Sequence, residues 1–237
     1  MRRTWPRNRA GWGWDAFVNE WLIWQLADAT FPAGGFAHSA GLEAARHWGE
    51  LRGPDRLVEF LEASLAQAGH SLVPFAAAAH EDPATLAEAD WRCHVFLSNH
   101  VANRASRLQG KAWLVAAEAA FGLKSLGQRR AEIRDHRLHG HFAPLFGAVT
   151  AALGIDLETA TRLLLYMVLR GLIASAIRLN VVGPLEGQAI QFRLGPLAEQ
   201  WARRSAAFRL DDAAQTAPGL EIFQATQDRL YSRLFQS

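Results

Sequence analysis

Apolar residues recur at steps of three and four along almost the whole chain, which is the spacing of a helix with one buried face. The clearest case follows Gly53-Pro54-Asp55, because proline suits the first turn of a helix, where its missing N–H costs nothing. We expect Gly69 to cap this helix at its C-terminal end. The apolar stripe between these two points consists of Leu57, Phe60, Leu61, Ser64, Leu65 and Ala68.

Breaks in the pattern divide the remaining chain into further predicted helices. Phe17 to Ala29 is expected to be helical and to end before the Gly34-Gly35 pair. Asp82-Pro83 opens a segment that runs to about Gly122, as one long helix or two abutting ones, because Asp82 can accept hydrogen bonds from first-turn N–H groups. The other predicted helices lie at about 143–153, from Asp156 to the Gly183-Pro184 break, from Gly195-Pro196 to about Phe208, and in an amphipathic segment at 220–235.

Three segments depart from the helical pattern. Residues 122–140 are polar and basic and are the best candidate for a long loop. Gln188 to Leu194 has the composition of a short strand, although no other segment offers it a partner of equal strength. Residues 211–219 are predicted to be a linker. The chain is therefore expected to be all-α, with a single domain of about eight to ten helices at residues 16–210 and a linker with an amphipathic C-terminal segment at 211–237.

The positive charge of the chain is concentrated at its N-terminus. The formal net charge is +2, and Arg2, Arg3, Arg7 and Arg9 lie in the first nine residues, where no acid occurs. Without these four arginines, 21 basic residues face 23 acidic ones, a net charge of −2. We therefore interpret residues 1–15, which are rich in Arg and Trp, as a disordered terminus and expect no nucleic-acid partner.

The chain also lacks the signals of export or of membrane insertion. Cys93 is its only cysteine, so no intrachain disulfide can form, which suits a reducing compartment. The N-terminal arginines are not followed by the apolar run of a secretory signal. The longest apolar stretch, Leu163 to Ile177, contains Arg170 and is shorter than the roughly 20 residues of a membrane span. We predict a cytoplasmic protein with this stretch as a buried central helix.

A search for reactive groups yields one weak metal candidate and no reaction centre. The sequence has no phosphate-binding glycine loop, no Gly-x-Ser-x-Gly elbow and no Cys-x-x-Cys pair, and no cofactor is expected. Cys93 and His94 are neighbours on a predicted helix and point about 100° apart, so Cys93 is interpreted as core filler. One cluster resembles a metal site, because imidazole suits nickel, copper and zinc. It consists of Asp135, His136, His139 and His141, for which a solvated loop with one or two structural histidines is the preferred interpretation.

The most distinctive motif is the segment Phe31 to Glu43, here called the Gly-Gly corner. Gly34 and Gly35 allow a tight turn after Pro32, because glycine adopts positive φ without strain. His38, Ser39 and Glu43 would then share or flank one face of the following helix. From the residues alone the motif is either a helix–helix corner or a contact site.

This motif and four others make the chain resemble the urease accessory protein F (UreF) family. The resemblance spans about residues 22–237 and rests on motifs that follow one another in the family's order. They are Gln25-Leu26-Ala27-Asp28 with the Gly-Gly corner, Asn103 to Gly110, His141 with Pro144, Phe146, Gly147 and Leu153-Gly154, Ala176 to Leu179 with Gly183, Gly187 and Gln188, and Tyr231 to Phe235 with Ser237. The chain departs from the family at Pro184, where many bacterial members have glutamine, and at Gln227-Asp228, where they often have His-Glu.

The resemblance implies an all-α homodimer in the complex that loads nickel into apo-urease. In that family the protein binds accessory protein D (UreD, called UreH in some species), and the pair docks the nickel-carrying GTPase UreG. The F protein helps to recruit this GTPase and controls its nucleotide cycle, and nickel passes to urease through an internal passage. No membrane partner is implied.

The C-terminal segment is expected to dock a partner, because its apolar residues have little core of their own to join. Arg178 lies in an apolar stretch and needs a carboxylate or carbonyl partner, either within the fold or on the GTPase. The predicted partner or dimer contacts are Gly34, Gly35, His38, Ser39, Glu43, Arg107, Gln109, Arg178, Gln188, Tyr231, Arg233, Leu234 and Phe235. The rival hypotheses are a nickel-binding protein that uses the 135–141 loop and an unrelated helical adaptor.

Overall fold

A computed structural model of the chain describes residues 20–237, so the predicted disorder of residues 1–15 lies outside the described part. Across residues 20–237 the regular elements are α-helices and one-turn 3-10 helices, with no β-strand. The predicted all-α, single-domain fold is confirmed.

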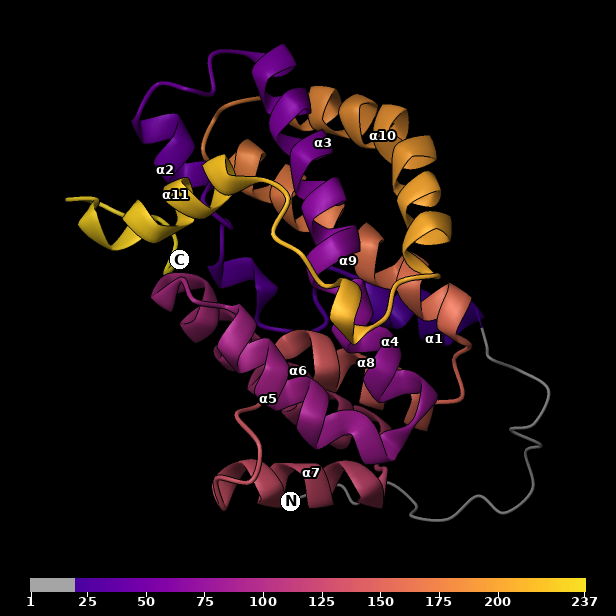
Figure 1. Cartoon of the computed structure of the whole chain (residues 1–237). Coiled ribbons are helices and arrows are strands. Elements are labelled where there is room, and N and C mark those ends of the chain that lie inside the picture. The colour runs from indigo at the N-terminus through magenta and orange to yellow at the C-terminus, as the bar shows by residue number, and fades with distance from the viewer. Residues whose placement is uncertain (1–19) are drawn as a thin grey trace, which may run out of the picture.

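Most helices follow one another with short connections, and the longest connections are residues 28–41 and 206–217, each of which contains a 3-10 helix (Figure 1). The α-helices are α1 (Glu20–Ala27), α2 (Leu42–His47), α3 (Pro54–Ser71), α4 (Val73–Glu81), α5 (Leu86–Phe96), α6 (His100–Phe121), α7 (Lys124–Arg134), α8 (Phe142–Ala152), α9 (Leu157–Arg178), α10 (Pro184–Ser205) and α11 (Pro218–Thr226). The 3-10 helices are η2 (Gly35–Ala37), η3 (Pro83–Thr85), η4 (Leu210–Asp212) and η5 (Gln227–Arg229).

Several helix ends are set by the caps that the sequence indicates. The Asp82 carboxylate accepts from the Ala84 N–H at 2.8 Å, and that of Asp156 accepts from the Thr159 N–H at 2.8 Å. The segment that begins at Asp82 is two helices, because Asn99 caps a new helix by accepting from the Val101 N–H at 3.0 Å. That second helix, α6, ends at Gly122, whose φ of 68° suits glycine.

Helix α9 is the central helix, as its apolar composition predicts. It packs against α3, α4, α8 and α10, which surround it in Figure 1. By length and composition α9 could cross a membrane, but 61% of its most apolar window is buried inside the fold. Burial of this kind is what a core helix requires.

Two glycines allow backbones to approach closely around this core. A Cβ added at Gly147 of α8 would collide with the carbonyl oxygen of Ala76 on α4. A Cβ at Gly110 of α6 would likewise collide with the carbonyl oxygen of Gly140, just before α8. Both sites belong to sequence motifs, so these motif glycines have a packing reason.

The predicted long loop at 122–140 is wrong, because most of it is helix α7. This helix has a narrow apolar face, in which Leu126 is buried and Ile133 is half-buried. Its polar side chains form ion pairs, among them Arg129 with Glu132 at 3.0 Å and Arg130 with Glu118 at 3.0 Å. One buried row of side chains is enough to hold a helix that is otherwise polar.

The short strand considered at 188–194, the helix start expected at Gly195-Pro196 and the cap expected at Gly69 are wrong. The helix predicted beyond Pro196 is confirmed as far as Ser205. Helix α10 runs unbroken through the segment proposed as a strand and through Gly195-Pro196, and Pro196 is tolerated because it lies on the exposed side. Gly69 lies inside α3 and does not end the helix, which continues to Ser71. Its missing side chain makes room for the Trp201 ring of α10, since a Cβ there would lie 3.0 Å from that ring. The sequence also gave no separate prediction for α4.

Candidate partner-binding site

The Gly-Gly corner turns where glycines take up positive φ. Gly34 has φ 75° and Gly41 has φ 87°, and the turn of η2 lies between them. A Cβ at Gly34 would lie 3.0 Å from the Cβ of Ala112 on α6, and one at Gly41 would lie 2.8 Å from the Gln224 nitrogen on α11. The corner is therefore packed on one side against α6 and on the other against α11.

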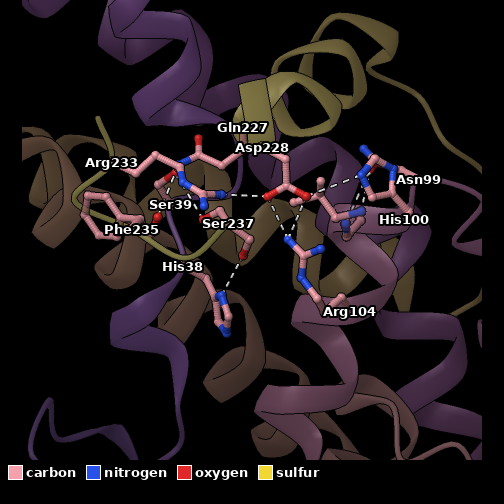
Figure 2. A network of polar contacts seen from close by, with 12 residues as sticks. His38, Ser39, Asn99, His100, Arg104, Gln227, Asp228, Arg233, Phe235 and Ser237 are labelled. Carbon is pink, nitrogen blue, oxygen red and sulfur yellow. Dashed lines mark hydrogen bonds and ion pairs between the residues drawn. The ribbon is translucent and has the colours of Figure 1, made fainter. Parts of the chain in front are cut away.

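The C-terminus of the chain returns to this corner and is hydrogen-bonded to it. The Ser39 N–H donates to the Ser237 carbonyl at 2.6 Å, and the Gln236 N–H donates to the Ala37 carbonyl at 2.8 Å. The Nδ1 atom of His38 lies 2.6 Å from the Ser237 hydroxyl, as Figure 2 shows. We call residues 34–43 together with residues 227–237 the corner–tail junction.

Glu43 holds the junction together from the inside. Its side chain is buried, and its carboxylate accepts from the Leu234 N–H at 2.6 Å and the Phe235 N–H at 3.1 Å. The Gln227 side-chain amide donates to the same carboxylate. No cation of the described chain pairs with Glu43, so the charge is stabilised by N–H donors alone, in the way that a buried carboxylate requires.

Arg178 finds its partners within the fold. Its guanidinium lies between two aromatic rings, 3.8 Å from the centre of Phe36 and 4.2 Å from the centre of Phe235. Its Nη1 donates to the Phe36 carbonyl at 2.7 Å. Of the two alternatives that the sequence left open, pairing within the fold is the one observed, and Arg178 thereby connects the end of α9 to both parts of the junction.

The expectation that the C-terminal segment has little core to join is wrong. Leu230 and Phe235 are 6% and 3% exposed, and Gln227 is fully buried. Tyr231 and Leu234, by contrast, are 104% and 52% exposed. The segment is amphipathic in the sense predicted, but its apolar inner face packs on its own domain. In the described structure, only the outer face of this segment is exposed and able to contact another molecule.

An ion-pair network covers the outer side of the junction. Asp228 accepts from Arg104 at 2.9 Å and from Arg233 at 2.7 Å, and the His100 Nε2 lies 3.4 Å away (Figure 2). Burial opposes ionisation of Asp228, but the hydrogen bonds and charges of the two arginines hold its pKa below the ordinary value. Gln227 is buried and Asp228 lies on the outer side, so these two neighbouring positions belong to opposite faces of the segment.

The structure separates some of the predicted contact residues from the junction. Gln109 is next to it, since a Cβ at Gly35 would lie 3.3 Å from the Gln109 amide nitrogen. Gln188 is exposed on α10, and Arg107 belongs to a different cluster, on the side of α6 that faces α5. The predicted contact residues therefore lie at three places: the corner–tail junction, the exposed side of α10 and the cluster around Arg107.

A cavity of about 370 Å³ lies behind the corner, and sequence reasoning did not find it. Its lining comes from the corner, α3, α6, α9 and α11, and is mostly apolar. Among the described residues of the lining, the one carboxylate is that of Glu221 on α11, to which Gln67 donates a hydrogen bond of 3.2 Å. Burial raises the pKa of Glu221 above its usual value. The elements that line the cavity are far apart in the sequence, so no local sequence pattern indicates it.

The histidines proposed as a metal site are arranged differently from that prediction. The His139 ring stacks on His94, with centroids 3.8 Å apart and planes 2° apart, so their nitrogens do not converge on one point. The His141 Nε2 lies at hydrogen-bonding distance, 3.2 Å, from the His94 Nδ1. His136 is exposed, with φ 58°. Within residues 20–237 no group of three His, Cys, Asp or Glu side chains could hold a metal ion.

His94 and Asp90 are the members of this cluster that sequence reasoning missed. Asp90 is buried, and its carboxylate accepts from the N–H groups of His139, Gly140 and His141, at 2.5, 3.1 and 2.8 Å for the shortest contact of each. Burial, followed by nearby positive charges, lowers the pKa of His141 to about 3. Cys93 is buried beside them, as predicted for core filler.

Comparisons with known proteins agree with the motifs. A family model described as UreF matches residues 51–195. The chain is 35% identical over 219 residues to urease accessory protein F of Oryza sativa subsp. indica, a match that covers 91% of this chain and 84% of that protein. It is 36% identical over 228 residues to urease accessory protein F of Arabidopsis thaliana, covering 92% of each. It is 31% identical over 217 residues to urease accessory protein UreF of Mesorhizobium japonicum, covering 87% of this chain and 91% of that protein.

Proposed function

The chain belongs to the UreF family of urease accessory proteins, and we propose that it acts as a non-enzymatic adaptor in nickel insertion into apo-urease. In this role it bridges the D protein (UreD or UreH) and the GTPase UreG in the cytoplasm and modulates the GTPase cycle. The observation that supports the adaptor role most strongly is the two-sided C-terminal segment of the corner–tail junction.

The inner side of that segment supplies rigidity. Glu43 binds the backbone of residues 234 and 235, and Arg178 lies between Phe36 and Phe235. The outer side presents Tyr231, Arg233 and Leu234 in fixed positions. Tyrosine and arginine are enriched among the residues that dominate protein–protein binding, and a preorganised surface binds at a lower entropic cost. We therefore place the contact with the D protein on this outer side.

A homodimer is part of the same proposal. Helix α10 presents a surface for it, since Leu185 and Phe192 are both 88% exposed and Gln188 lies between them. Large apolar side chains that share one exposed helix face are typical of a surface covered by another chain. The cavity behind the corner supports a second element, a route for nickel as cargo, because it reaches from the corner to α11 through the interior.

The test of the proposed D-protein contact changes only the outer side of the segment. A double variant, Tyr231→Ala with Leu234→Ala, is compared with Ile222→Ala, which removes an exposed apolar side chain from α11. Capture by immobilised D protein should weaken at least about tenfold for the double variant, as for loss of interface hot spots, and stay within about twofold for the control. Wild-type capture by the double variant would rule out this surface.

Light scattering on the same samples tests the homodimer. The free chain should have twice the 26.2 kDa mass of one subunit, and both variants should keep that mass. A monomer at micromolar concentration would contradict the homodimer while leaving the D-protein contact intact.

A further inference from the structure

The guanidinium of Arg107 on α6 has no hydrogen-bond or ion-pair partner among residues 20–237. Its Nε atom is enclosed by protein and makes no hydrogen bond, and Arg107 forms no ion pair with any residue from 20 to 237. An enclosed N–H without an acceptor is uncommon in folded proteins, because it has lost its water without replacing it. The side chain as a whole is only half-buried, so the tip of the guanidinium remains accessible from outside.

The charged and titratable groups around Arg107 are almost all basic. Lys111 follows one helical turn later and is exposed, also without an ion pair among the described residues. On the facing elements are His94 of α5 and His139, whose rings stack 3.8 Å apart and are half-buried. His141 lies behind them, and burial, followed by the charges of its basic neighbours, lowers its pKa.

Asp90, the acid that the described part of the chain brings to this group, is already occupied. Both oxygens of Asp90 accept backbone N–H groups of residues 139–141, so Asp90 does not reach Arg107. Like charges at positions i and i+4 of a helix, as at Arg107 and Lys111, destabilise the helix. Among the described residues, the fold therefore keeps two cations without an ion pair beside two imidazoles.

We propose that Arg107, Lys111 and the His94–His139 stack form a binding site for an oxyanion, either a phosphate group or a carboxylate. The guanidinium fork suits the paired oxygens of both, and Lys111 adds a point charge at the rim. The stacked rings of His94 and His139 border the site. This inference goes beyond the proposed adaptor function, since the site lies apart from the corner–tail junction.

The test uses the full chain and two neutralising variants. Arg107→Gln and Lys111→Gln are compared with Arg193→Gln, which removes an exposed arginine of α10 that forms no ion pair with the described residues. Inorganic phosphate and GDP are titrated at constant ionic strength, and the imidazole nitrogen resonances of His94 and His139 are followed by NMR. In parallel, capture of each variant by immobilised D and G proteins is measured.

The two arms distinguish the sources of the anion. Saturable shifts with phosphate or GDP that are lost in Arg107→Gln and kept in Arg193→Gln establish a phosphate site. Absence of these shifts, together with at least tenfold weaker capture of Arg107→Gln by a partner protein, establishes a partner carboxylate as the ligand. Unchanged capture without any shift would overturn the proposal, as would equal effects in all three variants.

Thermal unfolding separates this site from a structural role. Arg107→Gln should unfold at the same temperature as the wild type or higher, because it removes an unpaired charge and its repulsion from Lys111. A large loss of thermal stability would mean that Arg107 serves the fold, and would also overturn the proposal.

Discussion

Replacing Glu43 with alanine is expected to detach the C-terminal segment from the Gly-Gly corner and to abolish capture by the D protein. The carboxylate accepts the backbone N–H groups of Leu234 and Phe235 and the side-chain amide of Gln227. Without the carboxylate the N–H groups of Leu234 and Phe235 lose their acceptor, and the loss of hydrogen bonds to a charged group costs about 3 kcal/mol. This cost falls on one peripheral segment, so local release is expected before global unfolding.

Hydrogen exchange measures that release directly. Amides of residues 227–237 and the Ser39 amide, which donates to Ser237, should exchange at least about tenfold faster in Glu43→Ala, while helical content by circular dichroism stays the same. Glu43→Gln retains one carbonyl acceptor, so its exchange rates should lie between those of the wild type and those of Glu43→Ala. Glu62→Ala, on the exposed side of α3, is the matched control. Unchanged exchange in Glu43→Ala would mean that other contacts hold the segment.

Gly147→Ala is expected to have the largest effect on the stability of the whole fold. A methyl group at this position collides with the carbonyl oxygen of Ala76, so α4 and α8 must move apart. Their contact is backbone against backbone, and no flexible side chain can give way. Overpacking of this kind costs about 3 kcal/mol, which corresponds to a melting temperature lower by roughly 6–12 °C for a chain of this length.

The matched control is Gly171→Ala, in the middle of α9. A Cβ there meets nothing within 4 Å, so alanine gains helix propensity without a collision. This variant should be stabilised by up to about 1 kcal/mol. Differential scanning calorimetry of the two variants decides the matter, because a Gly147→Ala protein as stable as the wild type would show that α4 and α8 are not in close contact.

Much of the fold could be predicted from local signals. The caps at Asp82 and Asp156 mark helix starts because a carboxylate satisfies first-turn N–H groups wherever it occurs. The apolar run at 163–177 predicted a central helix because a helix that is apolar nearly all round must be buried. The prediction failed at α7, whose composition is polar, and in the middle of α10, whose composition is strand-like. In both, the tertiary contacts of one buried side stabilise the helix, and these contacts cannot be read from the local sequence.

The candidate site was harder to predict, because its parts are brought together only by folding. The motifs at the corner and at the C-terminus were both identified, but nothing local indicates that Glu43 binds the backbone of residue 235. His94 was judged only against its neighbour Cys93, while its partner His139 lies 45 positions away in the sequence and stacks on it. The inner and outer faces of the tail likewise became distinct only when the surface on which it packs was known.

The adaptor role is tested most directly by bridging. Immobilised D protein is incubated with the G protein, GTP and nickel, with and without this chain, and the retained G protein is quantified. We expect G protein to be retained only when the chain is present, and retention to be lost with the Tyr231→Ala, Leu234→Ala double variant. Equal retention of the G protein in the absence of the chain, or none in its presence, would contradict the proposed function.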